Sequence, residues 1–435
     1  MIDIKLIRET PDLVKGNIKK KIQEQKLPLV DKIIKLDQEW RDKKHKADKL
    51  RSERNKTSEE INQLMKNKEK DKAKTLIKKA KDIRTKIEKL EEETNKEEEE
   101  IKQILIKIPN MIWEKTPIGK GDEENVEIHK WGEPKKYDFE VKNHVELGEA
   151  LDIVDFDKSS KVSGKGFYYL KGDLALLNQA LISFARDFMI SKGYEYIEPP
   201  LMLKEKELYA SMDKEAIAES VYKIKDTDKG LIGTSEQSIL AYHSGDTIHE
   251  YDLPKKYFSY SMCFRQEIGA HGVNEKGLWR THQFNKIEQF IFCMPEDSEK
   301  IYDELLRNSQ EILELLELPY RTLELCSGDL ADWKYRSADL EVWRPTLNAY
   351  GEVVSLSNCT EYQARKLNIR YVSKDGNTRG ILHTLNDTAL ATSRIMVGIM
   401  ENNQNKDGSI NIPKKLRPYM GNKKKIEAKK NKIQK

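Results

Sequence analysis

Residues whose types and spacing could carry chemistry are concentrated between Tyr257 and Phe292, where two strand-like runs flank a Gly-rich, polar connection. Alternate side chains of a strand share a face, so Arg265 and Glu267 lie together on the first run, and Phe284 and Glu288 on the second. If the runs pair as a hairpin, one surface carries all four. A guanidinium can hold a phosphate, an aromatic ring a base, and a carboxylate an ammonium. The set therefore suits a nucleotide beside an amino group, although alternation alone favours an ordinary surface hairpin.

Composition limits the class of protein. A chain of 435 residues has room for about two or three domains, and 35% charged residues with a mean hydropathy of −0.76 require a very polar, extended element. No apolar run approaches the roughly 20 residues that span a bilayer, and the N-terminus lacks the apolar stretch of a secretory signal. We therefore expect a cytoplasmic protein with no membrane partner. The four cysteines form no CxxC pair, which predicts buried thiols with no disulfide and no zinc site.

That polar element is predicted over residues 28–108. The stretch between Pro28 and Pro109 contains neither proline nor glycine, and its apolar residues recur at steps of three and four. This pattern predicts two long helices that form an antiparallel hairpin, a coiled coil, with a turn near Asn67–Asp71. Eleven Lys/Arg against four Asp/Glu between Lys66 and Lys89 make the tip basic. A basic tip favours a polyanion, whereas the acidic run Glu91–Glu100 is typical of a solvated face.

The rest of the chain alternates between helical and strand patterns. These predict helices over 172–192, 297–316 and 388–402, and strands in GYEYIEPPLM, KYRSADLEVWRP and EVVSLSNC. Asn386 or Asp387 is placed to cap the last helix. Residues 111–170, rich in Pro and Gly, predict irregular connecting structure, and the Lys-rich residues 421–435 predict a disordered tail. The apolar face of the first strand-like run is expected to pack on the core; it carries Phe258, Tyr260, Met262 and Phe264.

Several stretches, in order and nearly over the full length, resemble the seryl-tRNA synthetases, which are class II aminoacyl-tRNA synthetases. They are GYEYIEPPLM (motif 1), GTSEQ, FRQEIGAHGVNEKGLWRTHQFNKIEQF (motif 2 with its loop), DLEVWRP, EVVSLSNCTEYQARK, and LNDTALATSRIMVGIMENNQ with LRPYMG (motif 3). The resemblance implies an α+β fold: a six- to seven-stranded antiparallel catalytic sheet preceded by a helical arm. It also implies a homodimer formed through motif 1, with Pro200 at the interface. The expected domains are the arm (1–110), a linker (111–170), the catalytic domain (171–420) and the tail (421–435).

The implied reaction has two steps. Serine and ATP give seryl-adenylate and pyrophosphate, and the seryl group then moves to the 3′ end of tRNA(Ser), with tRNA(Sec) left open as a second substrate. The tRNA is expected to contact the helical arm and the motif 2 loop, Gly269–Thr281. Arg265 and Arg394 are the implied catalytic residues, on the α-phosphate and the γ-phosphate. His271 and His282 are not expected to move protons, because the attacking carboxylate is already an anion.

The resemblance implies two overlapping sets of binding residues. The serine set is Thr234, Ser235, Glu236, Arg265, Glu288 and Thr388. The ATP set is Arg265, Gln266, Glu267, Phe284, Glu352, Val353, Val354, Ser355 and Arg394. Within it, Phe284 stacks on adenine, Glu267 meets the exocyclic amine, and Glu352 and Ser355 bind Mg²⁺. Strict alternation puts residues 352 and 355 on opposite faces, so we expect a bulge near Val353–Val354.

Other interpretations of the same residues remain open. Phe284 taken singly is a core residue, Glu288 an ion-pair partner of Lys286, and Arg394 a helix-surface charge. A class II synthetase for threonine, or a catalytically silent relative that only binds tRNA, would share much of the pattern. The chain also departs from the family at Leu208–Ser220 and in carrying TSE for the commoner TAE.

Overall fold

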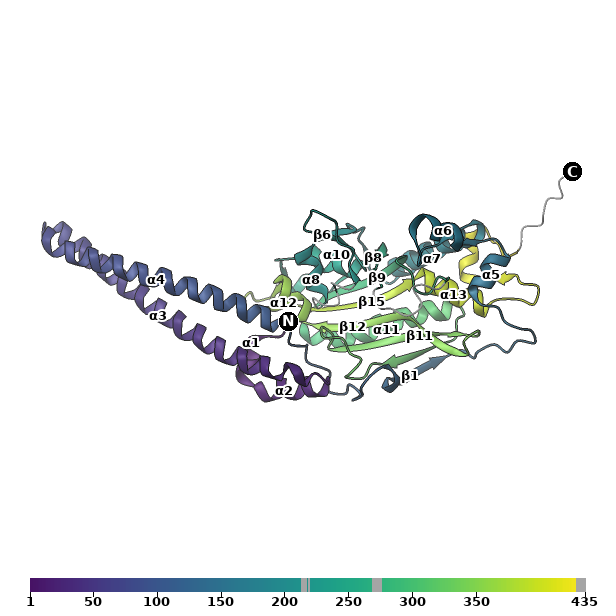
Figure 1. Ribbon diagram of the computed structural model, residues 1–435, viewed down its shortest axis with the longest axis horizontal. Helices are drawn as coiled ribbons and strands as arrows, with labels where there is room; N and C mark the ends of the chain where they lie inside the picture. Colours follow the sequence, from purple (N-terminus) through teal and green to yellow (C-terminus); the bar gives the residue numbers. More distant parts are fainter. Residues whose placement is uncertain (213–216, 218–219, 268–275, 428–435) are drawn as a thin grey trace. The chain divides into compact units, whose positions relative to one another are not determined.

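The computed structural model describes residues 1–212, 217, 220–267 and 276–427 (Figure 1). The chain divides into two compact units, Met1–Pro109 and Asn110–Lys435. Nothing in the described helices is both long enough and apolar enough to cross a membrane. All four cysteines are buried and free, as the sequence predicted.

The first unit is a long helical hairpin. Helices α3 (Leu27–Lys66) and α4 (Lys70–Leu105) run antiparallel and are joined at Asn67–Glu69, which confirms the predicted arm and its turn. Two short helices, α1 (Ile4–Glu9) and α2 (Pro11–Lys20), precede them. Burial follows one seam along the pair, formed by Val30, Ile33, Ala47, Ala73, Ile83, Ile87, Ile101 and Ile104.

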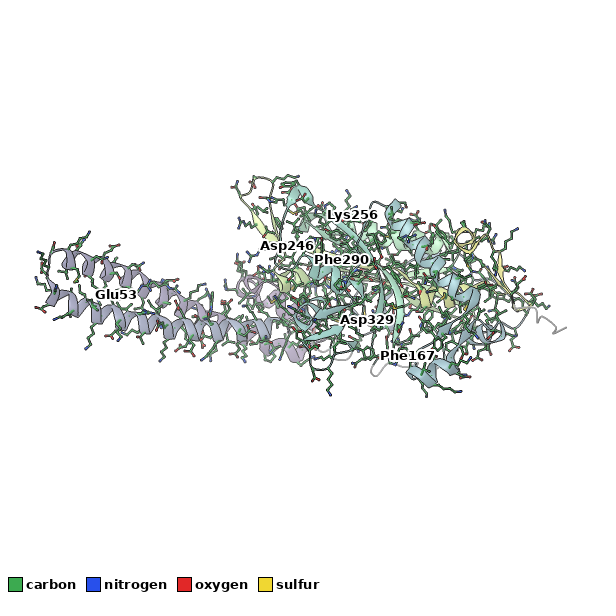
Figure 2. All side chains as sticks on the ribbon, turned by 90° about the horizontal axis from the view of Figure 1, so that it is seen from above. Glu53, Phe167, Asp246, Lys256, Phe290 and Asp329 are labelled. Carbon is green, nitrogen blue, oxygen red and sulfur yellow. The ribbon has the colours of Figure 1, made fainter. Side chains whose placement is uncertain are left out.

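Charged side chains project from both helices of the arm, as the sticks around Glu53 show in Figure 2. The acidic run on α4 is more than a solvated face, because its carboxylates pair with cations of α3. Lys43 Nζ lies 2.5 Å from Glu97 Oε1, and Arg51 Nη2 lies 2.6 Å from Glu91 Oε1. Each exposed pair contributes only about 0–1 kcal/mol. Toward the turn the cations still outnumber the carboxylates, with eleven Lys/Arg against four Asp/Glu between Lys66 and Lys89.

The second unit is built on an eight-stranded sheet. Its strands lie in the order β1 (Val126–Trp131), β10 (Tyr320–Glu324), β11 (Arg336–Arg344), β12 (Ala349–Thr360), β15 (His383–Ala391), β9 (Gln283–Cys293), β8 (Lys255–Phe264) and β4 (Glu195–Tyr196). Neighbours are antiparallel except β4 and β8, which are parallel. The described sheet therefore has more strands than the six or seven that the family resemblance implied, and it is not wholly antiparallel.

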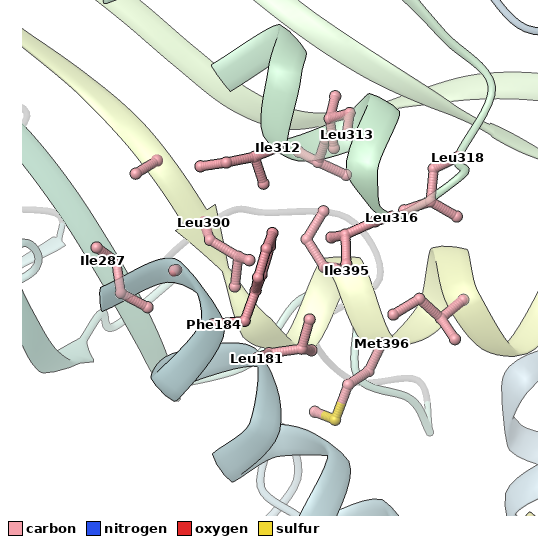
Figure 3. Packing of buried hydrophobic residues seen from close by; sticks show 14 of the residues in the cluster. Leu181, Phe184, Ile287, Ile312, Leu313, Leu316, Leu318, Leu390, Ile395 and Met396 are labelled. Atoms are coloured by element: carbon pink, nitrogen blue, oxygen red, sulfur yellow. The ribbon is translucent and has the colours of Figure 1, made fainter. Parts of the chain in front are cut away.

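Three helices cover the apolar face of this sheet: α7 (Gly172–Ser191), α11 (Ser298–Leu315) and α13 (Thr392–Asn402). Their side chains meet strand residues in one continuous core, seen in Figure 3 around Phe184, Ile312, Ile395 and Leu390. Full burial of each such side chain contributes about 1.5–3 kcal/mol. The opposite face of β9, β12 and β15 is left for polar side chains.

Smaller elements complete the second unit. In the described part of this unit, the other α-helices are α5 (His144–Ala150), α6 (Phe156–Ser163), α8 (Glu205–Ser211), α10 (Ser235–Tyr242) and α12 (Tyr362–Leu367). Its other strands are β2 (Val154–Asp155), β3 (Tyr169–Leu170), β5 (Met202–Lys204), β6 (Lys229–Leu231), β7 (Thr247–His249), β13 (Arg370–Val372), β14 (Arg379–Ile381), β16 (Ile410–Asn411) and β17 (Lys425–Ile426). The segment 111–170 is thus not simply irregular, because it supplies α5, α6 and the edge strand β1.

Two boundaries near the C-terminus differ from the prediction. The last helix begins at Thr392 rather than 388, because residues up to Ala391 belong to β15, a central strand bonded on both sides. Asp387 does not cap a helix; its Oδ2 accepts a hydrogen bond of 2.6 Å from Ser309 Oγ of α11. The tail predicted to be disordered from 421 is folded through the fully buried Ile426, which pairs with β16. Residues 428–435 lie outside the described part.

The faces of β8 also differ from the prediction. Met262, expected in the core, is 38% exposed, whereas Ser259, Ser261 and Cys263 are buried. Phe258 alone among the four apolar residues is fully buried. Both faces of β8 are covered, since Phe258 and the half-buried Tyr260 pack on the main core while Tyr257 lies in a cluster with Ile239 and Leu240 of α10. Alternation identified the two faces of this strand but not that both are covered.

Candidate active site

A pocket of about 410 Å³ opens on the polar face of the sheet. It brings together most residues of the two predicted sets: Thr234, Glu236, Arg265, Glu267, Phe284, Glu288, Glu352, Val353, Ser355, Thr388 and Arg394. They come from α10, β9, β12, β15, α13 and the chain just after β8. If Phe284 were only a core residue and Arg394 only a surface charge, there would be no reason for residues so far apart in sequence to line one pocket.

Three predicted residues lie outside the pocket lining. Ser235 is fully buried in the first turn of α10, and Val354 is 1% exposed and belongs to the core. Gln266 turns away, since its Nε2 donates to the carbonyl of Val221 at 2.8 Å. Any contact of Val354 with a ligand would come from its backbone.

A β-bulge on β12 brings Glu352 and Ser355 to the same face. Leu340 pairs with Val354 and Glu341 with Glu352, so Val353 is the extra residue. This confirms the bulge expected near Val353–Val354. Because the side-chain period of a strand is two, one extra residue resets the alternation.

A second bulge, on β15, was not foreseen. Thr388 pairs with Glu288 and Leu390 with Ile287, which leaves Ala389 unpaired. Ala391, which follows Leu390, pairs with Lys286 and lines the pocket like Thr388. The two neighbouring strands β12 and β15 therefore each carry a bulge beside the pocket.

One end of the pocket is aromatic and cationic. The Arg265 guanidinium lies 5.2 Å from the centre of the Phe284 ring, and its Nε donates to the carbonyl of Gly233 at 3.1 Å. Glu267, held in the left-handed backbone region, pairs with Arg280 at 3.0 Å. His282 Nδ1 lies 2.9 Å from the Arg265 carbonyl, a structural contact as predicted, whereas His271 lies outside the described residues.

The far end of the pocket holds Arg394. Its Nη1 donates to the Glu352 carbonyl at 2.8 Å and lies 3.3 Å from the Glu352 carboxylate. Its Nε donates to the carbonyl of Trp279 at 3.3 Å. Arg394 is thus only partly neutralised and stays open to the pocket, as a binder of a polyanion needs to be.

Glu352 and Ser355 offer hard oxygen donors of the kind that Mg²⁺ prefers. Beneath them Asp339 is half-buried with its Oδ1 enclosed, and this loss of solvent, followed by the nearby Glu352, raises its pKa to about 7. Its Oδ1 has no hydrogen-bond partner among the described residues. The described chain contains no group of three metal-ligating side chains, so an ion here would take its remaining ligands from phosphates and water. The donor set fits a magnesium ion that arrives with a nucleotide.

The part of the pocket around Glu288 and Glu236 is acidic and buried. Glu288 is 1% exposed, and its Oε2 accepts a hydrogen bond of 3.4 Å from Thr234 Oγ1. Lys286 Nζ lies 2.5 Å from the same oxygen, so the ion pair considered as the plainer interpretation of Glu288 does exist. Burial, and then the neighbouring Glu288, raise the pKa of Glu236 to about 7. Gln363 Nε2 donates to Glu236 at 2.6 Å.

A buried ion-pair network supports the pocket wall at Trp279. Glu401 on α13 accepts from Arg344 Nη2 at 2.9 Å and lies 3.0 Å from His144 Nδ1. The other ring nitrogen of His144 accepts from the Leu278 amide at 3.1 Å, so Nδ1 carries the proton. Although burial opposes ionisation, the hydrogen bonds from His144 and Arg344 lower the pKa of Glu401 to about 2.

Several pocket residues were missed by the sequence reasoning as site members. They are Lys286, Trp279, Arg280, Lys334 and Asn386. Strand register could have found two of them, because Lys286 lies between Phe284 and Glu288 on one face and Asn386 is two residues before Thr388. Lys334 donates to Ser355 Oγ at 3.2 Å from a loop, and no local pattern indicated this contact.

The sequence and the fold of this chain are similar to those of known proteins. Residues 222–403 match the model of the tRNA synthetase class II core domain (G, H, P, S and T), and residues 1–112 match the seryl-tRNA synthetase N-terminal domain. A serine–tRNA ligase of Methanocella arvoryzae is 44% identical over 97% of this chain and 99% of its own length. The crystal structure of a seryl-tRNA synthetase from Pyrococcus horikoshii complexed with ATP matches with a TM-score of 0.93 at 38% identity, covering 99% of this chain and 100% of that one. A cytoplasmic serine–tRNA ligase from Naegleria fowleri in complex with AMP matches with a TM-score of 0.88 at 32% identity, covering 99% of each chain.

Proposed function

Because the chain belongs to the seryl-tRNA synthetase family, we propose that its pocket binds ATP and serine side by side and joins them. The enzyme is a serine–tRNA ligase. It forms seryl-adenylate with release of pyrophosphate, then transfers the seryl group to the 3′-terminal adenosine of tRNA(Ser).

One observation carries the proposal. Phe284 and Glu288 lie on the same face of β9, with Arg265 at the strand end beside them, and all three line one pocket. The pocket therefore offers an aromatic surface for adenine, a guanidinium for the reacting anions and a carboxylate for an ammonium. An aminoacyl-adenylate carries the three matching groups: a base, a phosphate ester and an ammonium.

In the adenylation step, an oxygen of the serine carboxylate attacks the α-phosphorus, and the bond from that phosphorus to the bridging oxygen of pyrophosphate breaks. The nucleophile is already an anion, so positioning and charge stabilisation supply the catalysis. Arg265 contacts both the carboxylate and the α-phosphate, for which a planar guanidinium is better suited than an ammonium. Arg394 holds the γ-phosphate, and Glu267 accepts from the adenine amine.

A magnesium ion bound with ATP would neutralise phosphate charge and polarise the reacting phosphoryl group. Glu352 and Ser355 would hold it. The unpartnered oxygen of Asp339 beneath them supports a cation at this place. No part of the proposal requires zinc.

Serine is recognised by its ammonium and its hydroxyl. Glu288 and Thr234 accept the ammonium, and Thr388 and Glu236 line the space beyond them. A pocket that hydrogen-bonds a hydroxyl leaves its own polar groups unpaired when alanine enters, so binding alone can discriminate strongly. An editing site is not required by this argument.

The tRNA partner is assigned to the helical arm and the motif 2 loop. The basic excess near the turn at Asn67–Glu69 supports contact with phosphates, which position a nucleic acid without reading its sequence. The expected contacts of Gly269–Thr281 with the acceptor stem fall mostly on residues outside the described part. The enzyme is proposed to act in the cytoplasm, like the cytoplasmic relative from Naegleria fowleri, and to form a homodimer through motif 1. The tRNA(Sec) stays open as a second substrate.

The test is two linked assays on the purified full-length enzyme. Serine should stimulate exchange of labelled pyrophosphate into ATP, and labelled serine should become attached to tRNA(Ser). Pyrophosphate exchange without attachment of serine to tRNA(Ser) would support formation of seryl-adenylate and contradict the transfer step. Absence of both would refute it.

A further inference from the structure

Lys286 is a buried cation that the proposed mechanism does not yet use. It is 8% exposed and lies on the pocket face of β9, two residues after Phe284 and two before Glu288. Its cross-strand neighbours are Ser261 on β8 and Ala391 on β15. Because both are small, the ammonium is left facing the pocket rather than covered by side chains.

The contacts of this ammonium are those proposed for the substrate. Lys286 Nζ lies 2.5 Å from Glu288 Oε2 and donates to Thr234 Oγ1 at 3.4 Å. Glu288 and Thr234 are also the partners assigned to the ammonium of serine. Without serine, Lys286 therefore takes the place of the substrate ammonium and keeps a buried carboxylate paired, which avoids the large cost of an isolated buried charge.

The ammonium groups of Lys286 and of serine cannot both make these close contacts with Glu288 and Thr234. When serine pairs with Glu288, Lys286 loses its closest anion and needs another within reach of its side chain. Same-face residues of a strand are about 7 Å apart. With adenine at Phe284 and the serine ammonium at Glu288, the middle position faces the junction of the serine carboxylate and the α-phosphate.

We propose that Lys286 is a catalytic residue that pairs with Glu288 in the empty pocket and turns to the reacting carboxylate and α-phosphate once serine has displaced it. This inference rests on the proposed function and extends it. The carboxylate oxygen forms its bond to the α-phosphorus while the bond to pyrophosphate breaks, and pyrophosphate leaves with that electron pair. The Lys286 ammonium offsets the negative charge that gathers on the α-phosphate oxygens.

Displacement also adds a condition on the substrate. Only a ligand that brings its own ammonium to Glu288 releases Lys286 for the reaction. A hydroxy acid that lacks the ammonium would leave Lys286 paired, so binding and activation are coupled through one side chain.

The experiment measures serine-dependent ATP–pyrophosphate exchange for Lys286→Met. We expect kcat to fall by about 100- to 1000-fold, as on removal of one preorganised transition-state donor, while KM for serine stays within about threefold or falls. A role confined to holding the pocket together would instead raise KM. Lys286→Gln should lose the same activity, although its amide can still donate a hydrogen bond to Glu288. This second variant replaces Lys286→Met in the test if the methionine variant does not fold.

The matched control is Lys256→Met. Lys256, labelled in Figure 2, lies on the neighbouring strand and pairs with Glu304 at 2.7 Å, away from the pocket. This variant loses a Lys–Glu pair that is more exposed, 28% and 32% against 10% and 1%, and should keep the wild-type kcat. Kinetics of either Lys286 variant within about threefold of wild type, or a higher KM with unchanged kcat, would overturn the inference. Absence of serine-dependent exchange in the wild-type enzyme would refute the proposed function instead.

Discussion

Glu288→Gln tests the serine end of the pocket with the smallest change of shape. The substitution removes the negative charge that Lys286 contacts at 2.5 Å and that the serine ammonium is proposed to contact in its turn. A hydrogen bond to a charged partner contributes about 1.5–3 kcal/mol. At ~1.4 kcal/mol per factor of ten, kcat/KM for serine should fall by roughly 10- to 150-fold.

The same substitution should destabilise the folded protein. Removing one partner of a buried ion pair typically costs about 3–5 kcal/mol, and an amide that still accepts a hydrogen bond from Lys286 brings the expected loss to the lower end of that range. The double variant Lys286→Met/Glu288→Gln leaves neither charge buried. It should therefore recover most of the unfolding free energy without recovering serine binding.

The assay combines pyrophosphate exchange at varied serine and saturating ATP with urea unfolding followed by circular dichroism. KM for ATP should change little, because Phe284 and Arg394 are untouched. A serine dependence equal to that of the wild type would remove Glu288 from the substrate site. If Lys286→Met/Glu288→Gln were less stable than Glu288→Gln, the unpaired buried charge of Lys286 would not be the main cause of the lost unfolding free energy.

Two further outcomes follow from other parts of the molecule. Replacing residues 36–100 by a short linker should leave serine-dependent exchange largely intact and reduce tRNA charging by about two orders of magnitude or more, because the phosphate contacts are lost; an equal collapse of exchange would make the arm structural. Glu401→Gln should destabilise the protein at neutral pH and less so in acid. At ~1.4 kcal/mol per pH unit, the difference between 4.5 and about 2 is worth about 3 kcal/mol, present above the unfolded pKa and lost as pH falls toward the folded one. Unfolding midpoints of the two proteins between pH 6 and 3 should therefore converge, and a constant gap would contradict this.

The arm and the strand pair could be predicted because their signals are local. The absence of Pro and Gly between Pro28 and Pro109, with apolar steps of three and four, is enough to indicate a helical hairpin. The need to place Glu352 and Ser355 together was enough to indicate a bulge at Val353. The arm follows from the period of a helix alone, whereas the bulge also needed the two magnesium residues that the family resemblance implies.

Other features depend on long-range contacts that no local pattern contains. Asn386 and Asp387 are good capping residues, yet they lie in β15 because that strand is bonded on both sides and buried. Ile426, surrounded by lysines, suggested a solvated tail, yet it fills a buried position beside β16. Lys334 reaches Ser355 from a loop. Lys286 was considered only as a reason to doubt Glu288, although strand register placed it in the site.

ATP–pyrophosphate exchange with a panel of amino acids tests directly which amino acid the pocket activates. We expect strong stimulation by serine, and little by threonine or by alanine, which lacks the hydroxyl. Stimulation by threonine and not serine would identify a different class II synthetase. Equal stimulation by alanine and serine would contradict recognition of the hydroxyl in the pocket lined by Thr234, Glu288 and Thr388.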